Sequence, residues 1–123
     1  MILGTVTGAY EAVISLTVQG PAGQTREVES VIDTGFTGFL SLPSALVTEL
    51  GLPFLTTESA FLADGSLVSF SVHDATVFWD GHPRRVYVHI SDATPLVGMR
   101  MLDGHDLNIR VRDGGRVAIE AAQ

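Results

Sequence analysis

Val31-Ile32-Asp33-Thr34-Gly35-Phe36-Thr37 is the stretch from which the fold and function of this chain are inferred. An apolar run ends at Asp33, and Thr34-Gly35 then turns the backbone away. Glycine permits a close backbone approach, so this pattern predicts a carboxylate held at the mouth of a strand. The tripeptide Asp-Thr-Gly is unspecific by itself, because Asp and Gly are the commonest turn residues. The neighbouring sequence therefore decides what Asp33 does.

Most of the chain alternates apolar and polar residues with a period of two, which predicts half-buried strands. The alternating runs span residues 12–18, 68–72, 86–90 and 107–111. Asp-Gly pairs tolerate positive φ and favour tight hairpins. They predict hairpin turns at 64–65, 80–81 and 113–114.

A helix is expected at 44–50, with Pro43 before it and Gly51 placed to cap its end. A second helical turn is expected at 99–102. The period-two runs and these short helices predict a mostly antiparallel β domain with one or two short helices. The length of 123 residues fits a single domain over 1–123.

Composition restricts the function classes. The net charge of −7 argues against nucleic-acid binding, and all seven basic residues are arginines, which excludes Schiff-base lysine chemistry. No apolar run is long enough for a membrane span and no secretion signal is evident, so a cytoplasmic location is expected. The chain has no cysteine, and the histidines at 73, 82, 89 and 105 lack metal-site spacing, so neither a metal nor a cofactor is expected. Solvated or locally bonded histidines are favoured over a zinc site.

Together these elements resemble the retropepsin-like aspartic proteases, single-lobe enzymes that act as homodimers, and their small bacterial members in particular. The resemblance extends over roughly residues 10–120 and implies a closed acid-protease β-barrel. Four segments carry it, in order: the loop at 31–35; Leu40-Ser41-Leu42-Pro43 with the helix after it; the 58–72 hairpin; and Pro95-Leu96-Val97-Gly98.

The resemblance also implies roles for individual residues. Asp33 is the catalytic aspartate, the Thr34 hydroxyl bridges the dimer axis, and the Gly35 N–H approaches the carboxylate. Thr37 holds a position where the family often places a hydroxyl that bonds the outer carboxylate oxygen. Phe36 departs from the small residue that many relatives carry, and its ring is expected either to alter a substrate subsite or to pack into the core.

Two further segments have implied roles. Leu96, Val97 and Gly98 are expected to pack beneath the catalytic loop. The mobile hairpin, or flap, that closes over substrate has the tip Phe61-Leu62-Ala63-Asp64-Gly65-Ser66, which lacks a glycine-rich or aromatic apex. Because such dimers commonly pair their termini, Leu3, Val6 and residues 117–119 are candidates for a sheet between subunits.

Peptide hydrolysis by two carboxylates needs them about 3 Å apart, so that they share one proton. The chain has one Asp-Thr-Gly, so an enzyme requires a homodimer in which Asp33 meets its symmetry mate. The function implied is an aspartic endopeptidase acting on an extended peptide. Two alternatives remain: a catalytically silent peptide-binding or dimerisation module of the same fold, and an unrelated small β-barrel with a fortuitous Asp-Thr-Gly.

Overall fold

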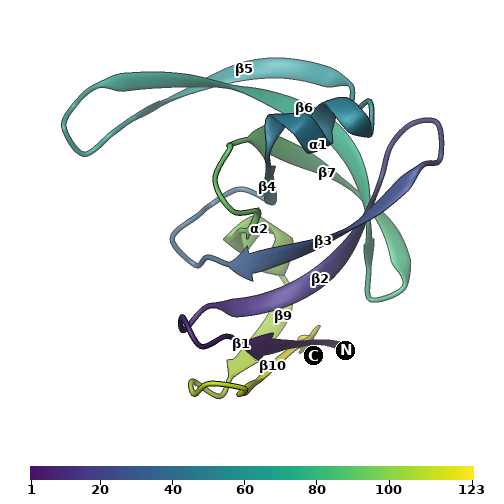
Figure 1. Ribbon diagram of the computed structural model, residues 1–123, viewed down its shortest axis with the longest axis vertical. Helices are drawn as coiled ribbons and strands as arrows, with labels where there is room; N and C mark the ends of the chain where they lie inside the picture. Colours follow the sequence, from purple (N-terminus) through teal and green to yellow (C-terminus); the bar gives the residue numbers. More distant parts are fainter.

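The computed structural model describes residues 1–123 as ten strands and two short helices (Figure 1). The strands are β1 (Ile2–Val6), β2 (Ala12–Gln19), β3 (Thr25–Ile32), β4 (Leu40–Leu42), β5 (Phe54–Phe61), β6 (Leu67–Trp79), β7 (His82–Ile90), β8 (Leu96–Val97), β9 (His105–Ile109) and β10 (Arg116–Ala121). The helices are α1 (Ser44–Glu49) and α2 (Met99–Leu102). Strands make up 54% of the chain and helices 8%, which confirms the predicted mostly β fold.

All ten strands belong to one sheet, in the order β5-β6-β7-β4-β8-β3-β2-β1-β10-β9. An additional antiparallel pairing of β2 with β6 joins the sheet to itself. The strands β6, β7, β4, β8, β3 and β2 thereby form a closed ring of hydrogen-bonded neighbours. Two pairings in the ring are parallel, β3 with β8 and β4 with β7. Both parallel pairings lie beside the segment that carries Asp33, so the ring is what positions the candidate site.

The core fills the inside of this ring. Alternate residues of β2 and β7 point inward, as the period-two runs predict, and Val18 and Val88 are fully buried. Val47 of α1 and Met101 of α2 join the same cluster of 21 buried residues. The helix α1 ends at Glu49, one residue before the predicted end, and Leu50 caps it before Gly51, which has a φ of +62°. Neither helix has the length and hydropathy needed to cross a membrane.

All three predicted Asp-Gly turns join antiparallel strands, but only one is a two-residue turn. Asp80 and Gly81 both have positive φ, 52° and 80°, which matches the right-handed twist of the strands they connect. The β5–β6 turn instead spans Leu62–Ser66. There the Asp64 carboxylate accepts hydrogen bonds from the N–H and hydroxyl of Ser66, so the side chain shapes the turn.

Two of the predicted half-buried runs differ in the structure. The strand β9, which contains the start of the 107–111 run, ends at Ile109. Val111 is 72% exposed in the turn that follows. The 68–72 run is a strand, but Val68 remains exposed because this part of β6 projects from the ring with β5. A two-stranded projection has no second layer against which to bury its apolar face.

The terminal strands pair with each other inside the chain. β1 lies between β2 and β10, and β10 lies between β1 and β9. Residues 117–119 are paired on both edges, whereas Ile2–Gly4 of β1 pair with β10 alone. Val6, Val117 and Ile119 are at most 1% exposed and belong to the core, whereas Leu3 is exposed. Val6 and residues 117–119 therefore offer no free edge for the predicted sheet between subunits, whereas for Leu3 such a sheet stays a prediction.

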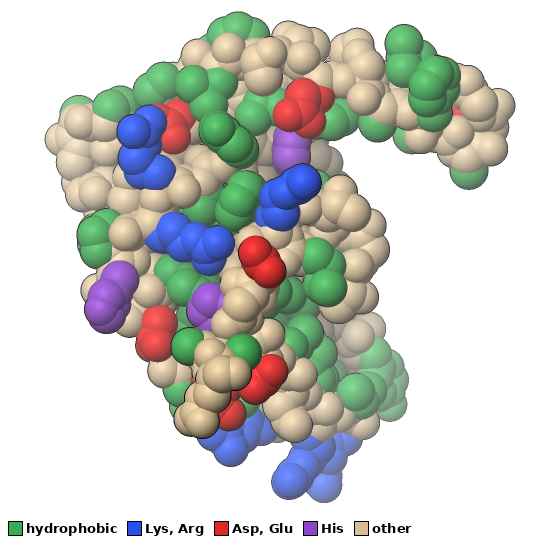
Figure 2. Space-filling view, turned by 180° about the vertical axis from the view of Figure 1, so that it is seen from behind, with side chains coloured by type: hydrophobic (Ala, Val, Ile, Leu, Met, Phe, Trp, Pro, Cys, Tyr) green, Lys and Arg blue, Asp and Glu red, His purple; other side chains and the backbone are tan.

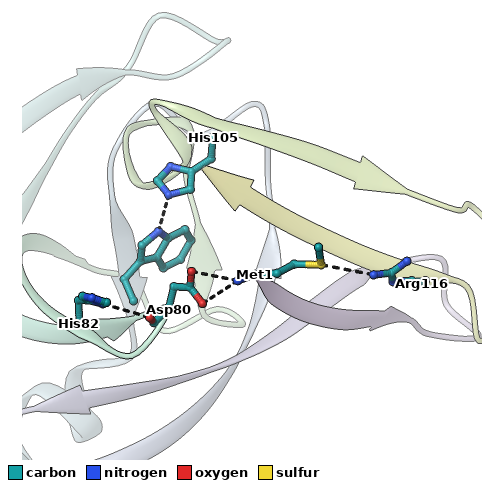
Figure 3. Close-up of polar contacts among 6 residues, drawn as sticks. Met1, Asp80, His82, His105 and Arg116 are labelled. Atoms are coloured by element: carbon teal, nitrogen blue, oxygen red, sulfur yellow. Dashed lines mark hydrogen bonds and ion pairs between the residues drawn. The ribbon is translucent and has the colours of Figure 1, made fainter. Parts of the chain in front are cut away.

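Polar contacts tie the first residue to the closed ring (Figure 3). The Met1 ammonium donates to both carboxylate oxygens of Asp80, at 2.8 and 3.0 Å. This hydrogen bond holds the pKa of Asp80 below its usual value. Beside it, Trp79 Nε1 donates to His105 Nε2 at 3.0 Å, which links β6 to β9.

Candidate active site

Asp33 is the first residue after β3, at the point where the chain leaves the ring. Its backbone N–H donates to the Val97 carbonyl at 2.9 Å, and its own carbonyl accepts from the Phe36 N–H at 3.1 Å. Asp33 Oδ1 accepts the Gly35 N–H at 2.9 Å. A Cβ at position 35 would stand 3.2 Å from Oδ1, so glycine allows this close approach. The second carboxylate oxygen has no hydrogen-bond partner within the chain.

The short strand β8 fixes both ends of the loop that contains Asp33. Leu96 and Val97 pair in parallel with the end of β3 and antiparallel with the start of β4. Val97 is fully buried, and the adjacent Gly98 donates its N–H to the Phe39 carbonyl at 2.9 Å. The strand that enters the loop and the strand that leaves it are thus held by one segment, Leu96-Val97-Gly98, which lies against the loop.

The other residues of the loop differ in exposure. Thr34 and Thr37 are exposed, and neither hydroxyl makes a hydrogen bond within the chain, to Asp33 or to any other group. Phe36 turns inward instead. Its ring packs over Gly98 and Gly38, where an added Cβ would come within 2.7 Å of it. Phe36 therefore occupies space that the two glycines leave open.

A hollow of about 490 Å³ lies between the Gly35–Gly38 part of the loop and the base of the β5–β6 hairpin. Ser41, Leu96 and Ile90 contribute to its wall on the side of the ring, and Glu58 and Phe70 contribute from the hairpin. Figure 2 shows the hairpin projecting beyond the body of the molecule with open space beneath it. Asp33 thus lies two residues from a hollow that an extended hairpin overhangs.

Among the residues of this hollow that sequence reasoning missed is His89. It was expected to be solvated or locally bonded, yet its side chain is only 17% exposed and lines the hollow. Phe36 and Phe70 pack against its ring edge-on, with centroids 5.5 and 5.1 Å away. His89 Nε2 lies 3.4 Å from Glu58 Oε2. Only strand register brings these residues together, so no local sequence signal identifies them.

The hairpin that overhangs the hollow is exposed along its length. Every residue from Phe54 to Ser69 is exposed, and Phe61 at the tip reaches 78%. Its turn is nevertheless ordered by hydrogen bonds between Leu62 and Ser66 and within Asp64–Ser66. The Ser66 hydroxyl, then its N–H, holds the pKa of Asp64 below its usual value. No three His, Asp or Glu side chains of the chain converge in a way that could hold a metal ion.

Comparisons with known proteins identify the fold. No protein-family model matches the chain, and no curated protein matches it. The chain is similar to the solved structure of a retropepsin-like aspartic protease from Rickettsia conorii, with a TM-score of 0.60 and 16% identity, over 99% of this chain and 91% of that one. It is also similar to EIAV protease complexed with the inhibitor HBY-793, with a TM-score of 0.56 and 14% identity, over 75% and 85% of the two chains. The chain therefore has a retropepsin-like fold, which confirms the sequence resemblance at the level of the fold.

Proposed function

We propose that this retropepsin-like chain is an aspartic endopeptidase that works as a homodimer. The observation that carries the proposal is the Asp33 carboxylate, which one N–H bond from Gly35 holds at the end of β3, beside a hollow overhung by a hairpin. Its second oxygen is unpaired in the chain and free to meet water or another carboxylate. The likeness in fold to two aspartic proteases supports the same chemistry.

The reaction needs two carboxylates with different protonation. Two such groups about 3 Å apart cannot both ionise, so they share one proton. The ionised member removes a proton from a water molecule, whose oxygen attacks the scissile carbonyl carbon. The protonated member donates a hydrogen bond to the carbonyl oxygen and stabilises the charge that develops there. The carboxylate that took the proton from water then passes it to the amide nitrogen as the C–N bond breaks, which releases an acid and an amine and restores the shared proton. General acid–base catalysis of this kind contributes about 10²–10⁴-fold.

The second carboxylate comes from a second copy of the chain, and the surface that we assign to this contact surrounds Thr34. A groove of about 250 Å³ lies beside Thr34, and seven of its nine lining residues are hydrophobic. Tyr10 and Val111 stand on it with 71% and 72% of their surfaces exposed. The β1–β2 turn, the loop after β3 and the β9–β10 turn all lie on the side opposite the termini (Figure 1).

Tyr10 carries a second indication of an interface. Its φ of +60° lies in the left-handed region, which costs an aromatic residue about 1 kcal/mol or more. The Thr7 hydroxyl maintains the turn by accepting the N–H groups of Ala9 and Glu11, both at 3.3 Å. The turn therefore presents the Tyr10 ring outward, where a partner would bury it. The flanking Glu11 and Arg112 are exposed and of opposite sign, so each would face the other's charge across a twofold contact.

Substrate would lie as an extended chain along the two hollows, between the paired Asp33 loops and the two hairpins. The β5–β6 hairpin then has the role of a flap, and its exposed apolar tip residues Phe61, Leu62 and Leu67 would cover the peptide. A flap that admits a chain must belong to the least stable part of the fold. Its two-stranded, unburied construction is consistent with that requirement.

Turnover of a peptide library by the wild-type protein and by Asp33→Asn tests the proposed activity. We expect Asp33→Asn to reduce activity by about 10²-fold or more, because it removes the ionisable group from both halves of the site. Asp106→Asn, which removes an exposed carboxylate on β9, is the matched control and should retain full activity. The pH profile should be bell-shaped on the acidic side, since one carboxylate must be ionised and the other protonated. An Asp33→Asn protein within tenfold of wild type would exclude the mechanism, and an intact dimer without turnover would favour the silent module.

Sedimentation velocity tests the dimer surface. Tyr10→Asp and Val111→Asp should each weaken the dimer by about tenfold or more, since a buried apolar side chain of this size is worth about 1.5–3 kcal/mol. Tyr87→Asp is the control, because Tyr87 is 56% exposed on β7, away from this groove. A wild-type monomer at micromolar concentration would remove the enzyme proposal for that state. Unchanged dimerisation of both groove variants would place the interface elsewhere.

A further inference from the structure

Side chains from both strands of the β5–β6 hairpin and from the Asp33 loop meet on the imidazole of His89. The Phe36 ring approaches it edge-on from the loop, with the two centroids 5.5 Å apart, and the Phe70 ring approaches from β6 at 5.1 Å. Glu58 Oε2 of β5 lies 3.4 Å from His89 Nε2. A carboxylate only accepts hydrogen bonds, so Nε2 is the donor. The His89 side chain is mostly covered by these neighbours.

The contact of His89 with the loop extends beyond Phe36. A Cβ at position 38 would stand 2.7 Å from His89 Cε1, so the imidazole packs directly over Gly38. The Phe36 carbonyl accepts the Met99 N–H at 2.8 Å, which holds this part of the loop from the other side. The Phe36 N–H donates to the Asp33 carbonyl at 3.1 Å. His89 therefore lies against the part of the loop whose backbone is bonded to Asp33.

His89 also lies where the hairpin leaves the closed ring of strands. It stands opposite Val72, the first residue of β6 that pairs with β7, and the hairpin projects beyond that point (Figure 1). Glu58 and Phe70 are opposite each other in the β5–β6 register, so both strands of the hairpin contact the same imidazole. The other side-chain hydrogen bonds of residues 54–69 stay within the hairpin. The Glu58–His89 bond is therefore the one side-chain hydrogen bond between these residues and the rest of the chain.

We propose that His89 is a positioning residue that couples the hairpin to the Asp33 loop. This inference rests on the proposed peptidase function, in which the hairpin closes over substrate. As the hairpin closes, Glu58 and Phe70 press on the imidazole, and the imidazole presses on the loop, because close-packed side chains transmit displacements. The closed hairpin is thereby held at a fixed height above the loop. The Glu58–His89 bond is expected to shorten in that state, as hydrogen bonds at active sites commonly do when substrate binds.

The polar and aromatic contacts of His89 can be removed separately. The bond to Glu58 is the only hydrogen bond of the imidazole, since Nδ1 is buried without a partner in the chain. Arg100, the other charged residue that lines the hollow, is bonded to the Thr37 carbonyl at 3.4 Å. A phenylalanine at position 89 would keep the edge-on aromatic contacts and lose the bond. A glutamine at position 58 would keep an oxygen that accepts from Nε2.

The kinetics of variants on one cleaved peptide test the coupling. A misplacement of about 1 Å can cost about 10²-fold in rate, so Glu58→Ala and His89→Phe should each lower kcat by about tenfold or more, with KM within about threefold of wild type. Glu58→Gln should lose less than Glu58→Ala. The double variant Glu58→Ala, His89→Phe should lose no more than either single one, because both changes remove the same bond. Glu120→Ala, which removes an exposed glutamate on β10, is the control and should keep full activity. Additive losses, or a Glu58→Ala protein as active as the control, would overturn the inference.

Amide chemical shifts separate this inference from the proposed function, because they need no turnover. In the free protein, Glu58→Ala should shift the backbone amides of Phe36 and Gly38, since these lie beside aromatic rings that the change would move, and Glu120→Ala should not. Shifted loop amides in a protein that cleaves no peptide would support the coupling and contradict the protease. Unchanged loop amides in a protein that does cleave would overturn the coupling and leave the protease standing. Glu58 is exposed, so Glu58→Ala should keep the wild-type Tm, and a fall of several degrees would show a merely structural role and overturn the inference.

Discussion

Gly98→Ala is expected to destabilise the fold strongly, because Gly98 lies in the tightest contact beneath the Asp33 loop. An added Cβ would stand 2.1 Å from the Gly38 carbonyl oxygen, 2.7 Å from the Phe36 ring and 2.8 Å from the Phe36 carbonyl oxygen. Ordinary contacts of a Cβ begin near 3.4 Å, so the two backbones must separate by more than 1 Å. The Phe36 ring can rotate away from the added Cβ, but the Gly38 carbonyl oxygen belongs to the backbone and cannot.

The magnitude follows from the contacts that this separation disturbs. Three backbone N–H groups, of Gly98, Met99 and Arg100, donate to carbonyls of residues 36–39 at 2.8–3.1 Å. Each such bond contributes about 0.5–1.5 kcal/mol net, and overpacking of a core costs about 1–3 kcal/mol. We expect Gly98→Ala to lower the free energy of unfolding by about 3–5 kcal/mol, a large share of the roughly 5–15 kcal/mol typical of a domain.

Urea unfolding followed by the fluorescence of Trp79, the single tryptophan and 5% exposed, measures the loss. Two glycines provide controls. Gly8→Ala meets nothing closer than 3.7 Å and should stay within about 0.5 kcal/mol of wild type. Gly104→Ala has open space but a φ of +80°, so it should lose about 1 kcal/mol from backbone strain alone. A Gly98→Ala loss no larger than that of Gly104→Ala would refute the steric argument.

Three further outcomes are expected. The N–H and hydroxyl of Ser44 hold the pKa of Asp92 below its usual value. The Asp92 carboxylate therefore stabilises the fold above its unfolded pKa of about 3.9. This stabilisation is lost as the pH falls through the folded pKa. The difference in urea midpoint between wild type and Asp92→Ala should therefore be present at pH 7 and small near about pH 2; an equal difference at both would contradict the assignment. Amide exchange at 62–67 should be fast in the free protein and slower with a statine-type inhibitor, whereas full protection without ligand would make the hairpin an ordinary structural element. Met101→Ala should lower the free energy of unfolding by about 2–5 kcal/mol in the same urea assay, because the side chain is fully buried, and a loss below 1 kcal/mol would be inconsistent with its place in the core.

The elements that the sequence predicted correctly are those with local causes. The Asp80-Gly81 turn forms because both residues accept positive φ, and α1 ends shortly before Gly51, which does the same. The position of Asp33 follows similarly from the apolar run before it and from Gly35 two residues later. Each of these features depends on residues within one turn or one strand, so a single sequence contains the required information.

The errors concern contacts between distant segments. Residues 117–119 alternate correctly for a strand, but their pattern does not state which strand lies beside them. In the structure β10 pairs with β1 of the same chain, so the edge of β10 that was expected to join a dimer sheet is already hydrogen-bonded. Val111 continues an alternating run, yet its strand ends at Ile109 because the turn to β10 begins there. Local patterns specify which face of a strand is apolar, but they do not specify which other strand it pairs with.

The candidate site likewise has features with local causes and features that depend on contacts between distant segments. The sequence by itself determined the strand-to-turn placement of the Asp33 carboxylate and the hairpin that follows it, since backbone sterics and period-two patterning act over a few residues. Only the tertiary structure decided that Leu96-Val97-Gly98 holds both ends of the loop, and that Ser41 and His89 lie side by side in the wall of one hollow. Those juxtapositions depend on the register between β4, β7 and β8, which is set by packing of the whole closed ring and by no residue taken alone.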